Sequence, residues 1–288
     1  MAYLIHLAIL FVIYAILGIS LNLVVGYTGL LSVTHAAFFG IGAYIVAILG
    51  MQFGLNFFVG LLLGVVVAGI ISFLIGFVLS RLGGDYYVLG TVGFNYIVWS
   101  VLLNWQEVTR GPLGIPGISR PKLFGLDFTS NLAFLFLAVI ILGAIYVFSQ
   151  SIVTSSFGRV LKAIREDERA INVFGYNTLY YKLTIFMIAA AMAAIAGSLF
   201  ASYITFISPA TFMVMESVFI LAIVILGGFA NLKGSLLGAL FLIFLPEALR
   251  FVGFTEDIAA QMRQAVYGLL LVVLMLYRPQ GLLGEYKL

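Results

Sequence analysis

Long runs of apolar residues alternate with short polar stretches along almost the whole chain. A transmembrane helix needs about 20 mostly apolar residues to cross a hydrocarbon layer about 30 Å thick. On this criterion the pattern predicts nine spans, at roughly Leu4 to Val25, Leu30 to Met51, Phe57 to Leu79, Tyr86 to Leu103, Leu132 to Phe148, Leu183 to Ile207, Phe212 to Phe229, Leu236 to Val252 and Met262 to Tyr277. The second and seventh begin in stretches that mix glycine or proline with polar residues, so either is predicted to be broken or re-entrant.

Composition supports the same class of protein. Of the 288 residues 64% are apolar and 9% are charged, which is more apolar surface than one soluble core can hide. We therefore expect an all-α integral membrane protein with one transmembrane domain over residues 1–288 and a cytoplasmic loop at 151–182. The absence of cysteine excludes disulfides and thiolate metal sites, and two distant histidines do not make a metal site. The N-terminal apolar run is interpreted as a retained span rather than a signal peptide.

The positions of lysine and arginine predict the orientation, because cytoplasmic loops are enriched in both. If the loop at 149–182 is cytoplasmic, nine basic residues lie inside and five lie outside. The inside group is Arg81, Arg159, Lys162, Arg165, Arg169, Lys182, Lys233, Arg278 and Lys287, and the outside group is Arg110, Arg120, Lys122, Arg250 and Arg263. The N-terminus is thus predicted outside and the C-terminus in the cytoplasm. A re-entrant segment near the start would reverse the N-terminus alone.

The most charged stretch reads "GRVLKAIREDERAINVFGYN", residues 158–177. Its helical periodicity predicts an amphipathic helix whose apolar stripe is interrupted at Asp167 and consists of Val160, Ala163, Ile164, Ala170, Ile171 and Phe174. Gly175 suits the left-handed residue that ends such a helix. A helix that rests on lipid headgroups explains the basic residues. The acidic run from Glu166 to Glu168 instead favours docking against a soluble protein.

Several catalytic motifs are missing from the sequence. ATP hydrolysis requires a phosphate-binding G-x-x-x-x-G-K-[ST] loop, and no Gly-Lys dipeptide occurs in the chain. The H-E-x-x-H and G-x-S-x-G motifs are absent as well. We therefore expect a subunit that is not an enzyme and that binds no cofactor of its own.

Small and polar residues lie at helical spacing inside the predicted spans. Small residues let helices approach closely in lipid, and four such faces are Gly60, Gly64 and Ala68; Ala36, Gly40, Ala43 and Ala47; Ala193, Gly197 and Ala201; and Gly234 with Gly238. Polar residues in a span are costly and often functional. The candidates for a translocation path are Ser32, His35, Tyr87, Thr91, Asn95 and Glu216, the last placed near the outer end of the seventh span. Contacts between helices would explain these residues equally well.

Five segments together resemble a known family. They are "GYTGLLSVTHAAFFGIGAY", "GGDYYVLGTVGF", "GRVLKAIREDERAINVFGYN", "SPATFMVMESVFILAIVILGG" and "YGLLLVVLMLYRPQGLLG". Their order and spacing resemble the permease subunits of branched-chain amino acid ABC importers, the LivM type, over roughly residues 20–284. The resemblance implies a fold similar to the large-bundle importer permeases, which include the cobalamin importer permease, in a prokaryotic cytoplasmic membrane.

The resemblance also implies partners. These are a second, related permease of the LivH type, two cytoplasmic ATPases that bind ATP and magnesium, and an extracytoplasmic substrate-binding protein, with lipid around the bundle and no nucleic acid. The stretch at 158–177 resembles the coupling helix that docks in a groove of the ATPase, and the residues that match the family's loop are Arg159, Arg165, Glu166, Asp167, Glu168, Ala170 and Gly175. Ile171 departs from this pattern, as do Thr34, Arg110 and Ala230 elsewhere.

Three functions remain after the resemblance is weighed. The first is ATP-driven import of leucine, isoleucine and valine by alternating access, with import of urea or short amides as its variant. An ion-coupled secondary transporter would need no partner and should show a mid-membrane carboxylate or broken helices in paired repeats. A passive channel or structural subunit would work without nucleotide. Binding of an ATPase subunit discriminates among the three.

Overall fold

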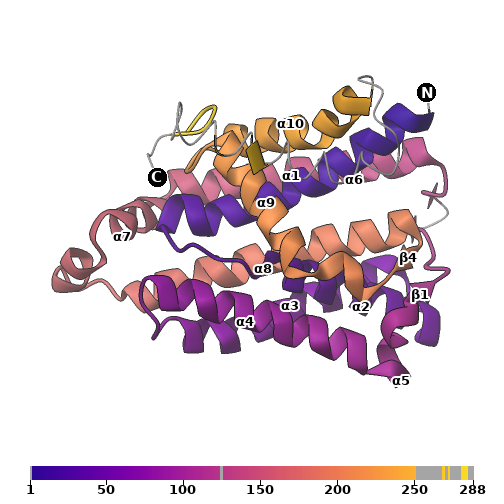
Figure 1. Ribbon diagram of the computed structural model, residues 1–288, viewed down its shortest axis with the longest axis horizontal. Helices are drawn as coiled ribbons and strands as arrows, with labels where there is room; N and C mark the ends of the chain where they lie inside the picture. Colours follow the sequence, from indigo (N-terminus) through magenta and orange to yellow (C-terminus); the bar gives the residue numbers. More distant parts are fainter. Residues whose placement is uncertain (1, 124–125, 251–267, 270–271, 273–279, 285–288) are drawn as a thin grey trace.

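The computed structural model describes residues 2–123, 126–250, 268–269, 272 and 280–284. Most of its long helices lie side by side along one axis (Figure 1). They are α1 (Ala2–Thr28), α2 (His35–Phe53), α3 (Phe57–Leu79), α4 (Asp85–Asn104), α6 (Asn131–Thr154), α7 (Ser156–Val173), α8 (Thr178–Ile204), α9 (Val214–Gly227) and α10 (Leu232–Arg250). The short elements are α5 (Gln106–Thr109), η1 (Gly111–Leu113), η2 (Pro209–Phe212) and two antiparallel pairs, β1 (Ile115–Pro116) with β4 (Phe206–Ile207) and β2 (Lys122–Leu123) with β3 (Leu126–Asp127).

Six helices of the described part are long and apolar enough to cross a membrane: α1, α2, α3, α4, α6 and α8. They correspond to the first six predicted spans, and α3 has the predicted bounds. Local chemistry explains several ends. The side chains of Asn56, Ser130 and Asn177 each accept a hydrogen bond from a backbone N–H in the first turn of α3, α6 and α8, respectively. Gly54, in the left-handed region, ends α2.

The last three predicted spans fare differently. Helices α9 and α10 are bent by 119° at a short break and form at most one span between them. The 14 residues of α9 measure about 21 Å at 1.5 Å per residue, too short to cross alone. The segment from Phe212 to Phe229 is therefore a half-helix and not a full span, which is the broken or re-entrant alternative predicted for it. The eighth prediction corresponds to α10. The ninth, Met262 to Tyr277, lies almost entirely outside the described residues, and a count of nine is not confirmed.

Helices α2 and α9 both begin inside the bundle. Residues 29–34 are not helical, and the backbone of Val33 is hydrogen-bonded to Thr91 and Asn95 near the middle of α4. Ser217, in the first turn of α9, is hydrogen-bonded to the same Asn95. The glycine-rich segment before α2 therefore breaks the second span, as its composition predicted.

Helices α2 and α9 run in opposite directions. Near the C-terminal end of α2, Asn56 donates to the carbonyl oxygen of Lys122, in the β2–β3 segment. Beyond the C-terminal end of α9, Phe229 lies under the guanidinium of Arg165 on α7. The β segments and α7 occupy opposite ends of the bundle (Figure 1). The N-termini of α2 and α9 thus meet at mid-depth.

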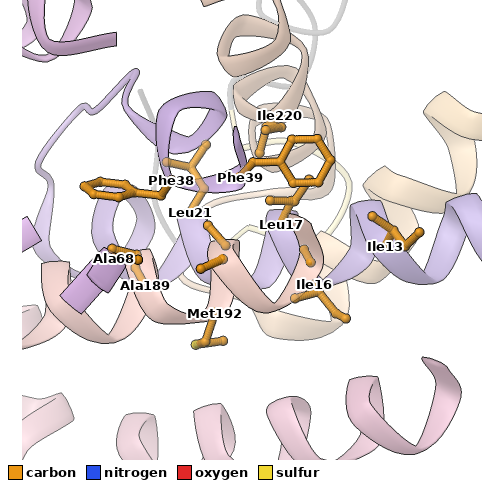
Figure 2. Packing of buried hydrophobic residues seen from close by; sticks show 14 of the residues in the cluster. Ile13, Ile16, Leu17, Leu21, Phe38, Phe39, Ala68, Ala189, Met192 and Ile220 are labelled. Carbon is orange, nitrogen blue, oxygen red and sulfur yellow. The ribbon is translucent and has the colours of Figure 1, made fainter. Parts of the chain in front are cut away.

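Helix α8 lies at the centre of the packing, against α1, α2 and α3. Figure 2 shows Ala189 of α8 beside Ala68 of α3, while Met192 of α8 points away from them. The predicted small faces lie at these contacts, since a Cβ added at Gly197 would collide with the backbone of α2 at Phe39. Ala68 is completely buried. Close approach of these helices therefore depends on residues without large side chains.

The described ends of the chain lie at opposite ends of the bundle. The start of α1 is at the end opposite α7 (Figure 1). The backbone N–H groups of Leu282 and Leu283 donate to the carbonyl oxygens of Leu226 and Gly227, at the C-terminal end of α9. The segment 280–284 therefore lies toward α7. Which end faces the cytoplasm stays a prediction, and Arg263, Arg278 and Lys287 lie outside the described residues.

Candidate translocation site and coupling helix

A polar cluster ties the beginnings of α2 and α9 to the middle of α4. Asn95 Nδ2 donates to Val33 O at 3.0 Å and to Ser217 Oγ at 2.8 Å. Ser217 Oγ also accepts from Ala36 N at 2.8 Å, and Thr91 Oγ1 accepts from Val33 N at 3.2 Å. The side chains of Thr91, Asn95 and Ser217 are completely buried. We call the five residues joined by these hydrogen bonds the central polar junction; they are Val33, Ala36, Thr91, Asn95 and Ser217.

Ser32 extends the central polar junction toward α7. Its hydroxyl lies 2.9 Å from that of Thr34 and close to the side chain of Tyr87. Tyr87 in turn lines a small cavity, whose other walls are Leu30, Gly76, Ser80, Leu82, Lys182, Leu183 and Phe186. Tyr87 therefore lies between the central polar junction and a cavity toward the α7 end.

Two buried side chains here have unused hydrogen-bonding capacity. Within the described part of the chain, neither ring nitrogen of His35 has a partner with hydrogen-bond geometry, although the ring lies close to the backbone of Ser20. The Oδ1 atom of Asn95 is likewise unpartnered among the described residues. Buried polar groups are normally hydrogen-bonded, so such atoms call for an explanation. They are groups that a bound solute or a second helix arrangement could satisfy.

Glu216 lies deeper than the sequence indicated. Its carboxylate accepts a hydrogen bond of 2.5 Å from the hydroxyl of Tyr14, which is near the middle of α1. The next residue, Ser217, contacts the middle of α4. The predicted place near the outer end of a span is therefore corrected to mid-depth, because α9 starts inside the bundle. A carboxylate at this depth is expensive, so Glu216 remains a candidate functional residue.

The structure brings the predicted path residues into two neighbouring groups. Thr91 and Asn95 belong to the central polar junction, and Ser32, Tyr87 and His35 lie beside it. Glu216 contacts α1 instead. Sequence reasoning missed Tyr14, Asn22, Thr34 and Ser217. Asn22 could have been found by the criterion that selected Asn95, because it too is an amide inside a long apolar run. Ser217 could have been found because it directly follows Glu216, the one carboxylate in the predicted span from Phe212 to Phe229.

Helix α7 lies at one end of the bundle and is divided at Asp167. This residue has φ −154° and ψ 98°, which is not helical. Its carboxylate accepts from the backbone N–H groups of Arg169 at 2.9 Å and Ala170 at 3.0 Å, so it caps a second helical piece. The predicted interruption of the apolar stripe is thus a break in the helix. Gly175 has φ +86°, the left-handed conformation expected of a helix stop.

The predicted coupling residues divide into an inward and an outward set. Arg165 donates to Gly26 O, and Glu168 forms an ion pair of 2.6 Å with Lys182. Ala170 is half-buried. The outward set is exposed and consists of Arg159, Glu166, Asp167 and Gly175. An apolar tip follows, in which Val173 and Phe174 are 87% and 76% exposed.

Reversal of one charge in the Glu168–Lys182 pair should loosen the connection between α7 and α8. Glu168 also accepts from the hydroxyl of Thr178 at 3.0 Å. The carboxylate side of the pair is 41% exposed, so we expect Glu168→Lys or Lys182→Glu to cost about 0.5–1 kcal/mol. The double reversal should recover most of this loss. Thermal unfolding of the purified variants measures it, and a double variant no more stable than the singles would contradict the pairing.

Comparison with known proteins is consistent with this arrangement. The family model described as branched-chain amino acid transport system / permease component matches residues 3–275. The chain is 38% identical to the high-affinity branched-chain amino acid transport system permease protein LivM of Escherichia coli K12, over 97% of this chain and 69% of that protein. It is 27% identical to the corresponding protein BraD of Pseudomonas aeruginosa, over 94% of this chain and 92% of that protein.

A shorter match links the chain to a second kind of permease. It is 33% identical to the permease protein LivH of Escherichia coli K12 over 46% of this chain and 41% of that protein. No solved structure matches the chain, so the expected likeness to large-bundle importer permeases stays a prediction.

Proposed function

This chain belongs to the family of branched-chain amino acid transport system permease components, and we propose that it imports leucine, isoleucine and valine as one permease subunit of an ATP-driven transporter. The observation that carries this proposal is the match over 97% of the chain to a permease of that name. The buried polar atoms where the N-termini of α2 and α9 meet suit such a solute. The bundle lies in a prokaryotic cytoplasmic membrane.

The proposed complex contains a second permease of the LivH type, two ATPases and an extracytoplasmic binding protein. The partial match to LivH supports a pair of related permeases. The exposed tip of α7 supports the ATPase contact, because the large apolar side chains of Val173 and Phe174 are exposed about one helical turn after the exposed Arg169, and apolar groups with a polar rim are typical of protein interfaces. ATP and magnesium are bound by the ATPases, and this subunit holds no cofactor.

The proposed solute path runs past Tyr87 and Ser32 to the central polar junction and Glu216. Branched-chain amino acids are zwitterions with an apolar side chain. The N-termini of α2 and α9 face each other at mid-depth, and helix N-termini favour a carboxylate. Glu216 is an acidic group suited to the ammonium. His35 and Asn95 have buried polar atoms that a solute can bind once the N-termini of α2 and α9 separate.

Reconstitution of the complex tests the proposed function. The permease is expressed with its LivH-type partner and ATPases, purified through a tag on this chain, and placed in vesicles with the binding protein. We expect the ATPases to co-purify and radiolabelled leucine to enter only with ATP. A permease that transports without them would contradict the proposal. Urea in place of leucine tests the variant substrate.

Labelling of single cysteines tests the proposed orientation. The natural chain has no cysteine, so each introduced thiol is unique. We expect Ser156→Cys, at the start of α7, to react with an impermeant reagent from the cytoplasmic side alone. Leu113→Cys, 82% exposed at the opposite end, should react from the outside alone. The reverse pattern would overturn the orientation, and labelling at residue 2 tests the N-terminus separately.

Ion-coupled transport is the second candidate, because two of its expected features are present. Glu216 lies at mid-depth, and α9 is a half-helix that is directed oppositely to α2. Leucine uptake driven by a proton or sodium gradient in vesicles of the permease without ATPases would favour this function. Membership of the permease family favours the ATP-driven function.

A further inference from the structure

Arg165 joins α7 to the last turn of α1. Its Nη1 donates to the carbonyl oxygen of Gly26, where a cation is favoured by the negative end of the helix dipole. Gly29 follows with φ +72°, and a Cβ there would lie 3.0 Å from Arg165 Cγ. The stem of Arg165 therefore lies against the residue at which α1 ends and the extended segment 30–34 begins.

The same side chain contacts the second helix break. The guanidinium carbon of Arg165 lies 5.5 Å from the ring centroid of Phe229, between α9 and α10. This break is fastened to α1 by Asn22, whose Nδ2 donates to Asn231 O at 3.0 Å and whose Oδ1 accepts from Ala230 N at 3.0 Å. Asn22 lies one helical turn before Gly26. One turn of α1, the α9–α10 break and α7 therefore meet at a single arginine.

Both contacts lead to the central polar junction. The segment after Gly29 carries Val33, which is bonded to Asn95 and Thr91. Helix α9, which precedes Phe229, carries Ser217, which is bonded to the same Asn95. The first route is the short non-helical segment from Gly29 to Val33, and the second runs along helix α9. Displacement of α7 therefore has two routes to the polar residues at mid-depth.

We propose that Arg165 is a positioning residue that transmits movement of α7 to both broken helices, and not a docking residue for the ATPase. This rests on the proposed function, in which nucleotide moves α7. The outward face of α7, with Glu166, Arg169 and Phe174, is left for the partner. The resemblance grouped Arg165 with Glu166 as coupling residues, whereas the contacts of Arg165 with Gly26 and Phe229 turn it toward the bundle.

A reporter in the extended segment tests this role. Leu31 is 38% exposed, so Leu31→Cys in the cysteine-free chain can be labelled with a maleimide in the full complex. We expect its labelling rate to differ between ATP-bound and nucleotide-free states. In Arg165→Ala this difference should shrink about tenfold, together with leucine uptake, while the ATPases still bind and hydrolyse ATP. Arg81→Ala, which removes an exposed arginine just after α3 that contacts only Phe77 among the rings described here, is the matched control and should respond like the parent.

Two milder variants separate transmission from folding. Arg165→Lys keeps a charge near Gly26 but loses the planar group over Phe229, and Phe229→Leu removes the ring alone. Each should give a smaller nucleotide-dependent difference than the parent. A normal difference in Arg165→Ala overturns the inference. If that variant fails to assemble, a normal difference in both milder variants overturns it instead.

The parent complex separates this inference from the proposed function. If the parent transports leucine with ATP and the Arg165→Ala variant behaves identically, only the inference about Arg165 is contradicted. A parent that shows no ATP-driven uptake contradicts the proposed function and the inference with it.

Discussion

Replacement of Asn95 with leucine is expected to reduce leucine uptake at least tenfold, a change of about 1.4 kcal/mol or more, and to destabilise the permease. Asn95 donates to Val33 O and Ser217 Oγ, so its loss frees one group in the non-helical segment before α2 and one in the first turn of α9. A buried group left without its partner costs about 1–3 kcal/mol. Uptake in vesicles and thermal unfolding of the purified complex measure the two effects.

Asn104→Leu is the matched control for this prediction. Asn104 lies on the same helix but is exposed, and its amide donates to Ser100 within α4. We expect wild-type uptake and stability. If Asn95→Leu lowers stability but the surviving protein transports normally, the central polar junction serves packing alone. If neither property changes, the hydrogen bonds to the half-helices contribute nothing measurable.

Replacement of Glu216 with glutamine is expected to lower leucine uptake about 10- to 100-fold, which corresponds to the 1.5–3 kcal/mol typical of a hydrogen bond to a charged group. The proposed partner of the carboxylate is the ammonium of the solute. Glutamine keeps the size of the side chain and can still contact the hydroxyl of Tyr14, so assembly and thermal stability should change little. Uptake at a saturating concentration of loaded binding protein measures the effect.

Tyr14→Phe and Glu107→Gln complete the test of Glu216. Tyr14→Phe removes the hydroxyl that orients the carboxylate and should give a smaller loss of uptake. Glu107 is exposed in α5, so its replacement controls for a lost negative charge. Stability that falls in Glu216→Gln while uptake per folded complex stays normal would assign the carboxylate a structural role.

The apolar pattern determined which segments are helices. Runs such as the one over α3 are long enough to cross the membrane and have no alternative way to satisfy their backbone groups in lipid, so sequence and structure agree on its bounds. The same local logic predicted the interruption at Asp167 and the stop at Gly175, because capping and left-handed conformations depend on a few neighbouring residues. The five family segments likewise lie in the sequence itself.

Tertiary structure decided where the broken helices begin and which polar groups meet. Hydropathy does not distinguish a full span from α9, whose short length and bend depend on contacts made with distant α1 and α4. For that reason Glu216 was placed too far from mid-depth. Arg165 and Glu166 are neighbouring charged residues that the sequence does not distinguish, yet Arg165 contacts Gly26 and Glu166 is exposed. Helical spacing gives the face of a residue, but the neighbours of that face come from parts of the chain more than a hundred residues away, so only the packed bundle identifies them.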